Sequence, residues 1–415
     1  MTTDRSSISV DIPHREIPDH VPPELVHPYA FGFGKKTEED AYLTLIPPIH
    51  AGPPIFYALD AYLGGQPAWV IRRAADLRKV YLDTEHFSNR GFAPFAGLVG
   101  ENWGLLPAES DPPLHGLHRA FVNPKFMPKS IRKSEEQARV IAREFIDKFK
   151  NDGECEFMSA FAYEFPIKIF LGLMGLPLDK TKLFLSWIDG LMHSGHADEM
   201  ISATRAVTAY LKEEMDDRRT NPRDDLLTYG VVGKIGDRPL TDDELTGFAF
   251  NLFVGGLDAV SGHMGSLFRH LAEDQANQRL LRERPEKIPD AVSEMMRAFA
   301  GSNTYRICTK ETQLCGQIIK PGDKVQMMVS LAGRDPEEYE DPNSINFDRK
   351  PILLSFATGP HFCLGVHLAR MEMRIAIEEF LREIPSFRIK PGAKVTTILS
   401  GVVQPEALPL VWDVT

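Results

Sequence analysis

The alternation of apolar and polar residues along the chain predicts a mainly α-helical protein with a smaller β region. Apolar residues recur every three or four positions in several long stretches, which places them on one face of a helix. The segments with this spacing, each predicted to be a helix, are residues 74–83, 134–149, 165–174, 241–271 and 366–377. The helix at 241–271 opens with Thr241, a capping residue, followed by an acidic first turn.

Short apolar runs between turn residues predict the β region. The predicted strands lie in 66–72 and 324–329, and the predicted hairpins lie in 305–319 and 399–413. Residues 1–40 are rich in proline, histidine and charge, which predicts an irregular N-terminal arm. No break in the pattern divides the chain, so we expect a single domain over residues 1–415, although the length alone would allow two or three domains.

The composition narrows the class of partner and the cellular compartment. The 415 residues carry a formal net charge of −11, which argues against a nucleic-acid partner. The N-terminal residues contain no apolar run long enough for a signal-peptide core or a membrane span, so we expect a soluble cytoplasmic protein. The four cysteines form neither a Cys-x-x-Cys pair nor a zinc-like spacing with histidine, which argues against a disulfide framework.

One cysteine stands in a context that indicates metal binding. Cys363 lies in a loop bounded by Gly359 and Gly365, directly before the predicted helix at 366–377, and Phe356 can shield its sulfur from water. The N–H groups of a helix N-terminus stabilise a thiolate, and glycine lets the backbone approach a flat ligand because it has no Cβ. A buried free cysteine is the usual alternative, but this context favours a soft metal ligand.

A pair of basic residues lies on another predicted helix. His115 and Arg119 follow Asp111-Pro-Pro, a sequence typical of a helix start, and their spacing of four residues places them on one helix face. By spacing alone, a solvated polar face is the simpler interpretation. The planar fork of an arginine is nevertheless suited to a carboxylate, which it can bind with two parallel hydrogen bonds.

The predicted helix at 241–271 contains residues that a helix interior tolerates poorly. Gly255 and Gly256 each cost about 1 kcal/mol relative to alanine, so a ligand that needs room or a distortion of the helix has to offset them. Asp258 follows in an apolar run, either as a satisfied core carboxylate or as a functional group. Asn251 lies one turn before Gly255, and its amide is either satisfied elsewhere or faces the same space.

These features together resemble the cytochrome P450 family, most closely its soluble bacterial camphor-monooxygenase group. The run that begins at Phe356, Phe-x-x-Gly-x-His-x-Cys-x-Gly-x-x-Leu-Ala-Arg, matches the haem-binding signature of the family at many fixed positions. The segment 255–258 resembles the distal helix of the family, and Glu-x-x-Arg at 294–297 resembles its buried ion pair. The resemblance covers nearly the whole chain and implies the cytochrome P450 fold, with haem between the distal helix and the cysteine loop.

The resemblance implies a haem-thiolate monooxygenase that binds haem b, iron protoporphyrin IX. Cys363 corresponds to the iron ligand, with Phe356, Gly359 and Gly365 around it, and its thiolate pushes electron density towards the iron. The residues that correspond to the partners of the two haem propionates are His115, Arg119, Arg306 and His361. The implied reaction inserts one atom of O2 into a C–H bond and releases the other as water.

Proton delivery is assigned by the resemblance to Asp258, but the chain departs from the family at the next position. Ala259 stands where the family normally has a threonine, whose hydroxyl holds the water that supplies protons. A water, a hydroxyl of the substrate or Ser261 can take its place, although Ser261 lies two residues further along the helix and points elsewhere. His193 and His196 show no convincing metal-binding spacing with a carboxylate partner and are interpreted as surface residues.

The substrate is expected to bind between the 89–110 loop, the helix around 251–259, the 301–305 turn and the C-terminal hairpin. A loop as long as 89–110 is usually functional in a compact domain. The residues predicted to contact the substrate are Phe92, Trp103, Asn251, Val254, Gly255 and Val402. Trp103 takes by order the place of the tyrosine with which camphor-type enzymes bind a ketone. We therefore predict a terpenoid-like or norisoprenoid-like ketone of similar size rather than camphor.

Electrons have to come from another protein, because the sequence contains no flavin or iron–sulfur motif. The resemblance implies a small acidic ferredoxin with its reductase, docking near the thiolate side. The cations predicted to form its landing patch, with scattered solvated charge as the alternative, are Arg72, Arg73, Arg78, Lys79, Arg119 and Lys125.

Two other functions stay open at this point because Ala259 removes the usual relay. The chain can be a haem protein that binds a hydrophobic ligand without turning it over. It can also be an enzyme that works with peroxide, or with a hydroxyl that the substrate supplies.

Overall fold

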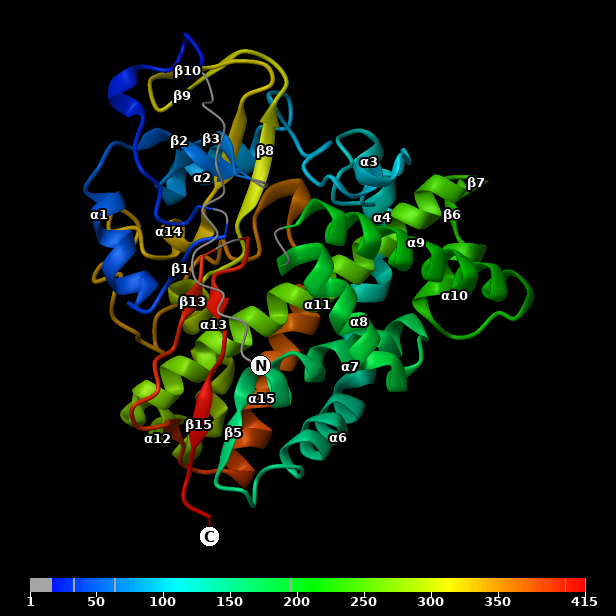
Figure 1. Cartoon of the computed structure of the whole chain (residues 1–415). Helices are drawn as coiled ribbons and strands as arrows, with labels where there is room; N and C mark the ends of the chain where they lie inside the picture. Colours follow the sequence, from blue (N-terminus) through cyan, green and yellow to red (C-terminus); the bar gives the residue numbers. More distant parts are fainter. Residues whose placement is uncertain (1–16, 33, 63–64, 194–195, 400, 415) are drawn as a thin grey trace.

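The fold is mainly helical, with the largest sheet gathered at one side of the molecule (Figure 1). The computed structural model describes residues 17–32, 34–62, 65–193, 196–399 and 401–414. The helices are α1 (Ile46–His50), α2 (Ala74–Leu82), α3 (Phe95–Val99), α4 (Leu114–Phe126), α5 (Pro128–Ile131), α6 (Glu135–Ile146), α7 (Glu164–Met174), α8 (Thr181–Ile188), α9 (Ala197–Thr220), α10 (Leu226–Val232), α11 (Asp242–Glu273), α12 (Gln275–Glu283), α13 (Ile288–Ala298), α14 (Val329–Gly333) and α15 (Val366–Glu383). The strands are β1 (Lys36–Thr37), β2 (Ile55–Tyr62), β3 (Gln66–Ile71), β4 (Phe87–Ser88), β5 (Glu154–Glu156), β6 (Lys234–Ile235), β7 (Arg238–Pro239), β8 (Thr304–Cys308), β9 (Thr312–Leu314), β10 (Gln317–Ile319), β11 (Lys324–Met327), β12 (Arg388–Ile389), β13 (Thr397–Ile398), β14 (Gln404–Pro405) and β15 (Pro409–Val411).

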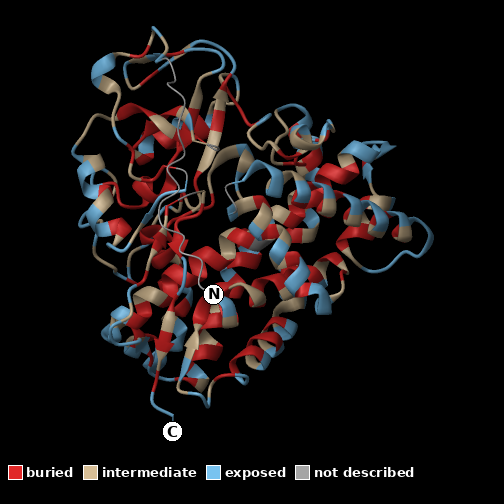
Figure 2. Cartoon of the chain, in the orientation of Figure 1, coloured by how far each residue is buried: buried red, intermediate tan, exposed pale blue. Residues whose placement is uncertain are grey.

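The long helix α11 crosses the middle of the molecule, where most side chains are buried (Figure 2). Its start is the capping box that the sequence predicts: the Thr241 hydroxyl accepts from the Glu244 N–H, and the Glu244 carboxylate accepts from the Thr241 N–H. By length and composition α11 resembles a membrane span, but 65% of its apolar window is buried in the protein. Packing within the protein therefore explains its apolar character.

The predicted helices are all confirmed: α2, α6, α7, α11 and α15 cover the segments in which apolar residues recur every three or four positions. The long loop at 89–110 contains the short helix α3. In the part of the N-terminal arm that the structure describes, from Ile17 onward, the chain forms a 3₁₀ turn at Pro23–Leu25 and the two-residue strand β1.

The strand pairings differ from the prediction in two places. β8 pairs antiparallel with β11 and β4 in the five-stranded sheet β2-β3-β11-β8-β4, so the hairpin expected over 305–319 is shorter and consists of β9 and β10. Its turn at Cys315-Gly316 has both residues at positive φ, which suits a two-residue hairpin. The expected terminal hairpin is divided: β14 pairs with β13, and β15 pairs with β5 and β12. Local sequence does not determine which strands pair.

A buried ion pair fixes the segment that leads to the cysteine loop. Glu294 and Arg297 on α13 are both fully buried, and their side chains approach to 2.8 Å. Arg297 also donates to the carbonyl oxygens of Gly333, Pro342 and Ser344. With these bonds the guanidinium and the carboxylate are satisfied inside the protein, which is the condition under which a buried charge pair is tolerated.

Candidate functional site

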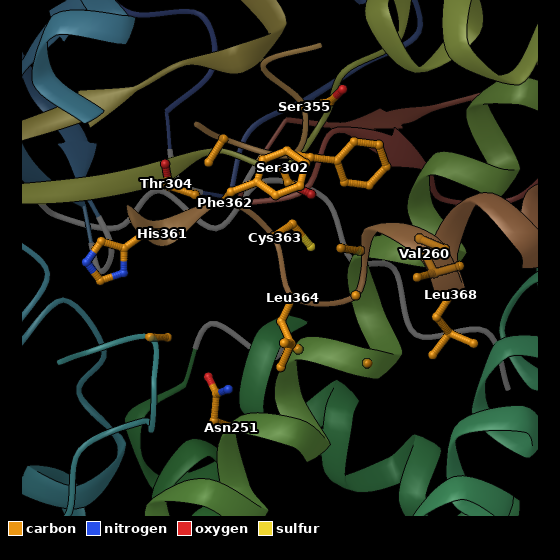
Figure 3. Close-up of a pocket in the computed structure, with 18 of the residues that line it drawn as sticks. Asn251, Val260, Ser302, Thr304, Ser355, His361, Phe362, Cys363, Leu364 and Leu368 are labelled. Atoms are coloured by element: carbon orange, nitrogen blue, oxygen red, sulfur yellow. The ribbon is translucent and has the colours of Figure 1, made fainter. Parts of the chain in front are cut away.

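A cavity of about 340 Å³ lies between α11 and the cysteine loop, and its wall is mostly apolar. Figure 3 shows Cys363 near the middle of the lining residues, with Leu364 beside it and Asn251 on a facing helix. The predicted site residues that line the cavity are Phe92, His115, Arg119, Asn251, Gly255, Ala259, Arg306, Phe356, His361, Cys363 and Gly365. Residues from five separate stretches of sequence are thus brought together around one space.

The cysteine loop is held by backbone hydrogen bonds. The Cys363 N–H donates to the carbonyl oxygen of Phe356 at 2.9 Å, and α15 begins three residues later. Gly359 has φ of +71°, and a Cβ there would lie 2.8 Å from the side chain of Leu82. Gly359 is therefore needed for the turn and for packing against α2, and it is not among the described residues that line the cavity.

Burial affects the pKa of the Cys363 thiol more strongly than the helix N-terminus does. Burial raises the pKa of Cys363, while the backbone N–H of Gly365 and the charge of Arg119 lower it in part. The protein alone therefore favours the thiol. A cation bound at the sulfur would reverse this balance, because a coordinating thiol is deprotonated by the metal.

Four basic side chains gather at one end of the cavity. His115 and Arg119 come from α4, Arg306 from β8 and His361 from the cysteine loop. The rings of His115 and His361 lie 4.1 Å apart between centroids. The pKa of His115 is lowered to about 4 and that of His361 to about 3, by burial and to a smaller extent by neighbouring basic groups. Arg119 donates to the carbonyl oxygen of Phe362.

This cluster lacks negative charge. Within the described part of the chain, neither Arg119 nor Arg306 forms an ion pair, and burial lowers the pKa of both guanidinium groups. The Nε2 atom of His115 is buried without a hydrogen-bond partner. Buried cations and unsatisfied polar atoms are costly unless an anion joins them, so the cluster fits a ligand that carries carboxylates at this end of the cavity.

The glycine pair of α11 is explained without any distortion of the helix. A Cβ at Gly256 would lie 2.6 Å from the ring of Phe170, so this glycine allows α7 to pack closely. A Cβ at Gly255 would meet no atom within 4 Å, and the residue lines the cavity together with Ala259. The helix is continuous from Asp242 to Glu273. Gly256 is therefore needed for the close packing of a neighbouring helix, whereas Gly255 borders open space of the cavity.

His193 is exposed in the structure, as predicted, but its side chain also pairs with two carboxylates. His193 ends the π-helical turn η6 (Asp189–His193), and its Nε2 lies 2.9 Å from Oδ1 of Asp258, while its Nδ1 lies 3.5 Å from Oδ1 of Asp189. Asp258 is buried, and it is not among the described residues that line the cavity. Its carboxylate faces the histidine on another side of α11, a contact between residues 65 positions apart that spacing within one helix does not reveal.

Of the residues predicted to contact a substrate, Phe92, Asn251 and Gly255 line the cavity and the other three do not. Trp103 is buried against Phe250, and its indole N–H donates to Glu101. Val254 packs against the large apolar core. Val402 packs closely on Gly262, because a Cβ added to this glycine would lie 2.6 Å from Cγ1 of Val402. Each of these three apolar side chains packs against other residues of the protein. The sequence pattern shows that such a side chain has to be buried, but it does not show whether the contact is with the protein or with a ligand.

Two buried polar residues of the cavity wall were not anticipated. His263 lies one turn after Ala259 on α11. Glu372 is buried on α15, and burial raises the pKa of its carboxyl group well above the usual range. The sequence does carry a signal for Glu372, because it follows Leu368 by four residues on the apolar face of the predicted helix.

Comparison with known proteins gives consistent results over most of the chain. The family model for Cytochrome P450 matches residues 174–411. The chain is 36% identical to the probable cytochrome P450 127A1 of Sinorhizobium fredii (strain NBRC 101917 / NGR234), over 92% of this chain and 93% of that protein. The crystal structures of CYP101J2 and of cytochrome P450 CYP101C1 each match with a TM-score of 0.86 at 29% identity, covering 96% of this chain and 100% of theirs.

Proposed function

The chain belongs to the cytochrome P450 family of haem-b monooxygenases, and from this premise we propose that it hydroxylates a small hydrophobic terpenoid-like or norisoprenoid-like substrate. The observation that carries the proposal is the mostly apolar cavity between Cys363 and α11, with the amide of Asn251 at its wall. Such a cavity binds an apolar molecule and orients it through one polar group. O2 and the electrons of a ferredoxin complete the proposed reaction.

Cys363 is the proposed iron ligand, and the basic cluster at the end of the cavity is the proposed partner of the two haem propionates. The cluster, His115, Arg119, Arg306 and His361, supports this assignment because it lacks negative charge in the described structure. Propionates would supply that charge and satisfy the buried atoms. When bound, haem b activates O2 so that one oxygen atom enters a C–H bond and the other leaves as water.

The protein's own residues bind and orient the substrate and exclude water. Phe92 and Gly255 offer apolar contact, and the Asn251 side chain, which has no hydrogen-bond partner among the described residues, can pair with a carbonyl or hydroxyl group. A polar group of the substrate that pairs with Asn251 fixes which carbon faces the reacting end of the cavity. We propose in this way a ketone or an alcohol rather than a hydrocarbon.

Protons are proposed to reach the distal side through Asp258. Support comes from its contact with His193, whose pKa burial would lower but hydrogen bonds to Asp189 and Asp258 raise to about 10. The imidazolium holds a proton 2.9 Å from the Asp258 carboxylate. The side chain of Ala259 carries no hydroxyl group, and Ser261 is not among the described residues that line the cavity. The last step is therefore assigned to water or to a hydroxyl of the substrate.

A small acidic ferredoxin is the proposed electron donor, and we propose that it uses an apolar surface near the cysteine loop in addition to the predicted landing patch. The cations of α2 and its neighbourhood are already paired: Arg72 and Arg73 with Glu337, Arg78 with Glu338, and Lys79 with Asp76. The exposed apolar side chains near the cysteine loop are Leu82, Leu114, Leu117 and Phe362. A partner that docks there gains from apolar contact as well as from charge.

We also propose that residues 1–415 form one domain that works in the cytoplasm. The support is that related chains match over nearly their whole length without a boundary. One observation, the alanine at position 259, favours two alternative functions. The chain is then either a haem protein that binds its ligand without turnover or an enzyme that uses peroxide.

A binding screen followed by turnover tests the proposal. Terpenoid and norisoprenoid ketones, the matching alcohols and the parent hydrocarbons are titrated into the ferric protein, and the spin-state shift is read from the absorption spectrum. We expect the oxygenated compounds to bind about three- to tenfold more tightly, and Asn251→Leu to cancel this difference. If no tightly binding compound yields a product, either with a reduced ferredoxin chain or with peroxide, the protein is a binder and not a monooxygenase of this class.

A further inference from the structure

His263 joins α11 to another wall of the cavity through two hydrogen bonds. Its side chain is buried and lines the cavity one helical turn after Ala259. The Nδ1 atom lies 2.6 Å from the carbonyl oxygen of Ala259, and Nε2 lies 3.0 Å from the backbone nitrogen of Gly301. The proposed reaction assigns no role to this histidine.

The two partners determine the tautomer of the His263 ring. A backbone N–H can only donate, so Nε2 accepts from Gly301. A carbonyl oxygen can only accept, so Nδ1 carries the hydrogen and donates to Ala259. Burial lowers the pKa of His263, which preserves the neutral ring that this pair of bonds requires.

Gly301 belongs to a segment of the cavity wall that is held by backbone contacts, here called the 301–304 wall. The N–H of Val403 donates to the carbonyl oxygen of Gly301 at 3.0 Å, and a Cβ at Gly301 would lie 2.7 Å from the oxygen of Val403. Ser302 forms a bridge with Val402, so the wall pairs with the C-terminal segment beside it. Ser302 and Thr304 of this wall line the cavity.

The helix itself packs closely on the same segment. A Cβ at Gly262 would lie 2.6 Å from Cγ1 of Val402, and a Cβ at Gly265 would lie 3.2 Å from Pro405. These contacts set the distance between α11 and the C-terminal segment that pairs with the wall, but apolar contacts are not directional. The bonds of His263 are directional, and they fix the position of Gly301 relative to Ala259.

We propose that His263 is a positioning residue: its neutral imidazole ties the 301–304 wall to the Ala259 turn of α11 and thereby sets the shape of the ligand cavity. The inference rests on the family of the chain and not on the proposed substrate. A ligand that fills the cavity contacts Ser302 and Thr304 on one side and Ala259 on the other. Loosening the tie changes the fit of large ligands and leaves small ones unaffected.

Three substitutions separate the two bonds. In His263→Gln the side-chain amide reaches the place of Nε2, and its oxygen can accept from Gly301. In His263→Asn the amide reaches only the place of Nδ1, so the bond to Ala259 is retained and the bond to Gly301 is lost. His263→Phe removes both. Ser266→Ala is the matched control, because Ser266 is buried on the same helix, contacts Gly262 and Tyr42, and is not among the described residues that line the cavity.

Two measurements on the haem-loaded proteins decide the outcome. Hydrogen exchange reports the Gly301 amide, and absorption titrations give the Kd of a large ligand, 4-phenylimidazole, and of a small one, cyanide. We expect the Asn and Phe variants to exchange about tenfold faster at Gly301 and to change the 4-phenylimidazole Kd about threefold or more, with cyanide unchanged. The Gln variant and Ser266→Ala should match the wild type.

The proposal is overturned if the Asn variant keeps the wild-type exchange rate and 4-phenylimidazole affinity. It is also overturned if the Gln variant behaves like the Asn variant, because the Gly301 bond would then not be the one that matters. If the Phe variant fails to load haem, the comparison between Asn and Gln still decides.

Discussion

The pair formed by His193 and Asp258 makes a prediction about stability whose size can be worked out. His193→Gln keeps the size of the side chain and a donor but removes the positive charge. Burial alone would lower the pKa of His193, but the hydrogen bonds to Asp189 and Asp258 raise it to about 10. An unfolded histidine titrates at about 6.5, and each pKa unit is worth about 1.4 kcal/mol, which gives an upper limit of about 5 kcal/mol.

Solvent reduces this limit. The side chain of His193 is 25% exposed and that of Asp189 is 77% exposed, so water screens one of the two contacts. We therefore expect about 2–3 kcal/mol of the free energy of unfolding to depend on the charge of His193. Because the folded-state pKa is raised, this contribution is complete below about pH 6.5, decreases above it, and is lost at about pH 10.

Urea unfolding of the wild type and of His193→Gln, at equal haem loading and at several values between about pH 6.5 and 9.5, measures the difference. The advantage of the wild type should shrink steadily as the pH rises. Asp258→Asn should remove the same advantage, and adding it to His193→Gln should cost little more, as expected for two residues that act as one pair. His196→Gln is the control for a nearby histidine. A difference that stays constant with pH would refute the reasoning.

Four further substitutions test other parts of the site. Cys363→Ala should abolish the thiolate-ligated absorption of the reduced carbon monoxide complex, and survival of that band would exclude this cysteine as the ligand. Ala259→Thr should couple electron use more tightly to product formation, measured as product per NAD(P)H in the reconstituted system; unchanged or poorer coupling would show that the chain has its own relay. Gly256→Ala should destabilise the fold by about 1–3 kcal/mol, because its Cβ would lie 2.6 Å from the Phe170 ring. Gly255→Ala should be neutral or stabilise α11 by up to about 1 kcal/mol, since nothing lies within 4 Å; equal thermal shifts in both variants would contradict this difference.

The parts that the sequence predicted are those that local physics determines. The helix α11 could be predicted from its apolar spacing and from the capping box at Thr241. The cysteine loop could be predicted from its glycines and from the helix that follows it. The basic residues near the cavity came from the family resemblance, and the structure places them at one end of the same space. Their lack of an acidic partner became visible only in three dimensions.

The parts that escaped prediction depend on contacts between distant segments. Trp103 is of a residue type that often contacts a substrate, but its ring already packs against Phe250 and its N–H donates to Glu101. His193 was interpreted as a surface residue, yet the fold places Asp258, 65 residues further along the chain, beside it. For both residues the sequence pattern did not identify the partner in the fold.

The geometry of α11 bears on how protons complete their path. Asp258 and Ala259 are neighbours in sequence, but consecutive residues of a helix point about 100° apart, so the carboxylate faces His193 while Ala259 faces the cavity. Among the described residues that line the cavity from α11, only Asn251 and His263 carry polar side chains, and both ring nitrogens of His263 are engaged. Asn251 lies eight residues before Ala259, about 12 Å along the axis. No side chain of this helix is therefore placed to hand a proton across at Ala259, and we expect a water or the substrate's own hydroxyl to do so. Substrates that carry such a hydroxyl should then give tighter coupling than their deoxygenated analogues.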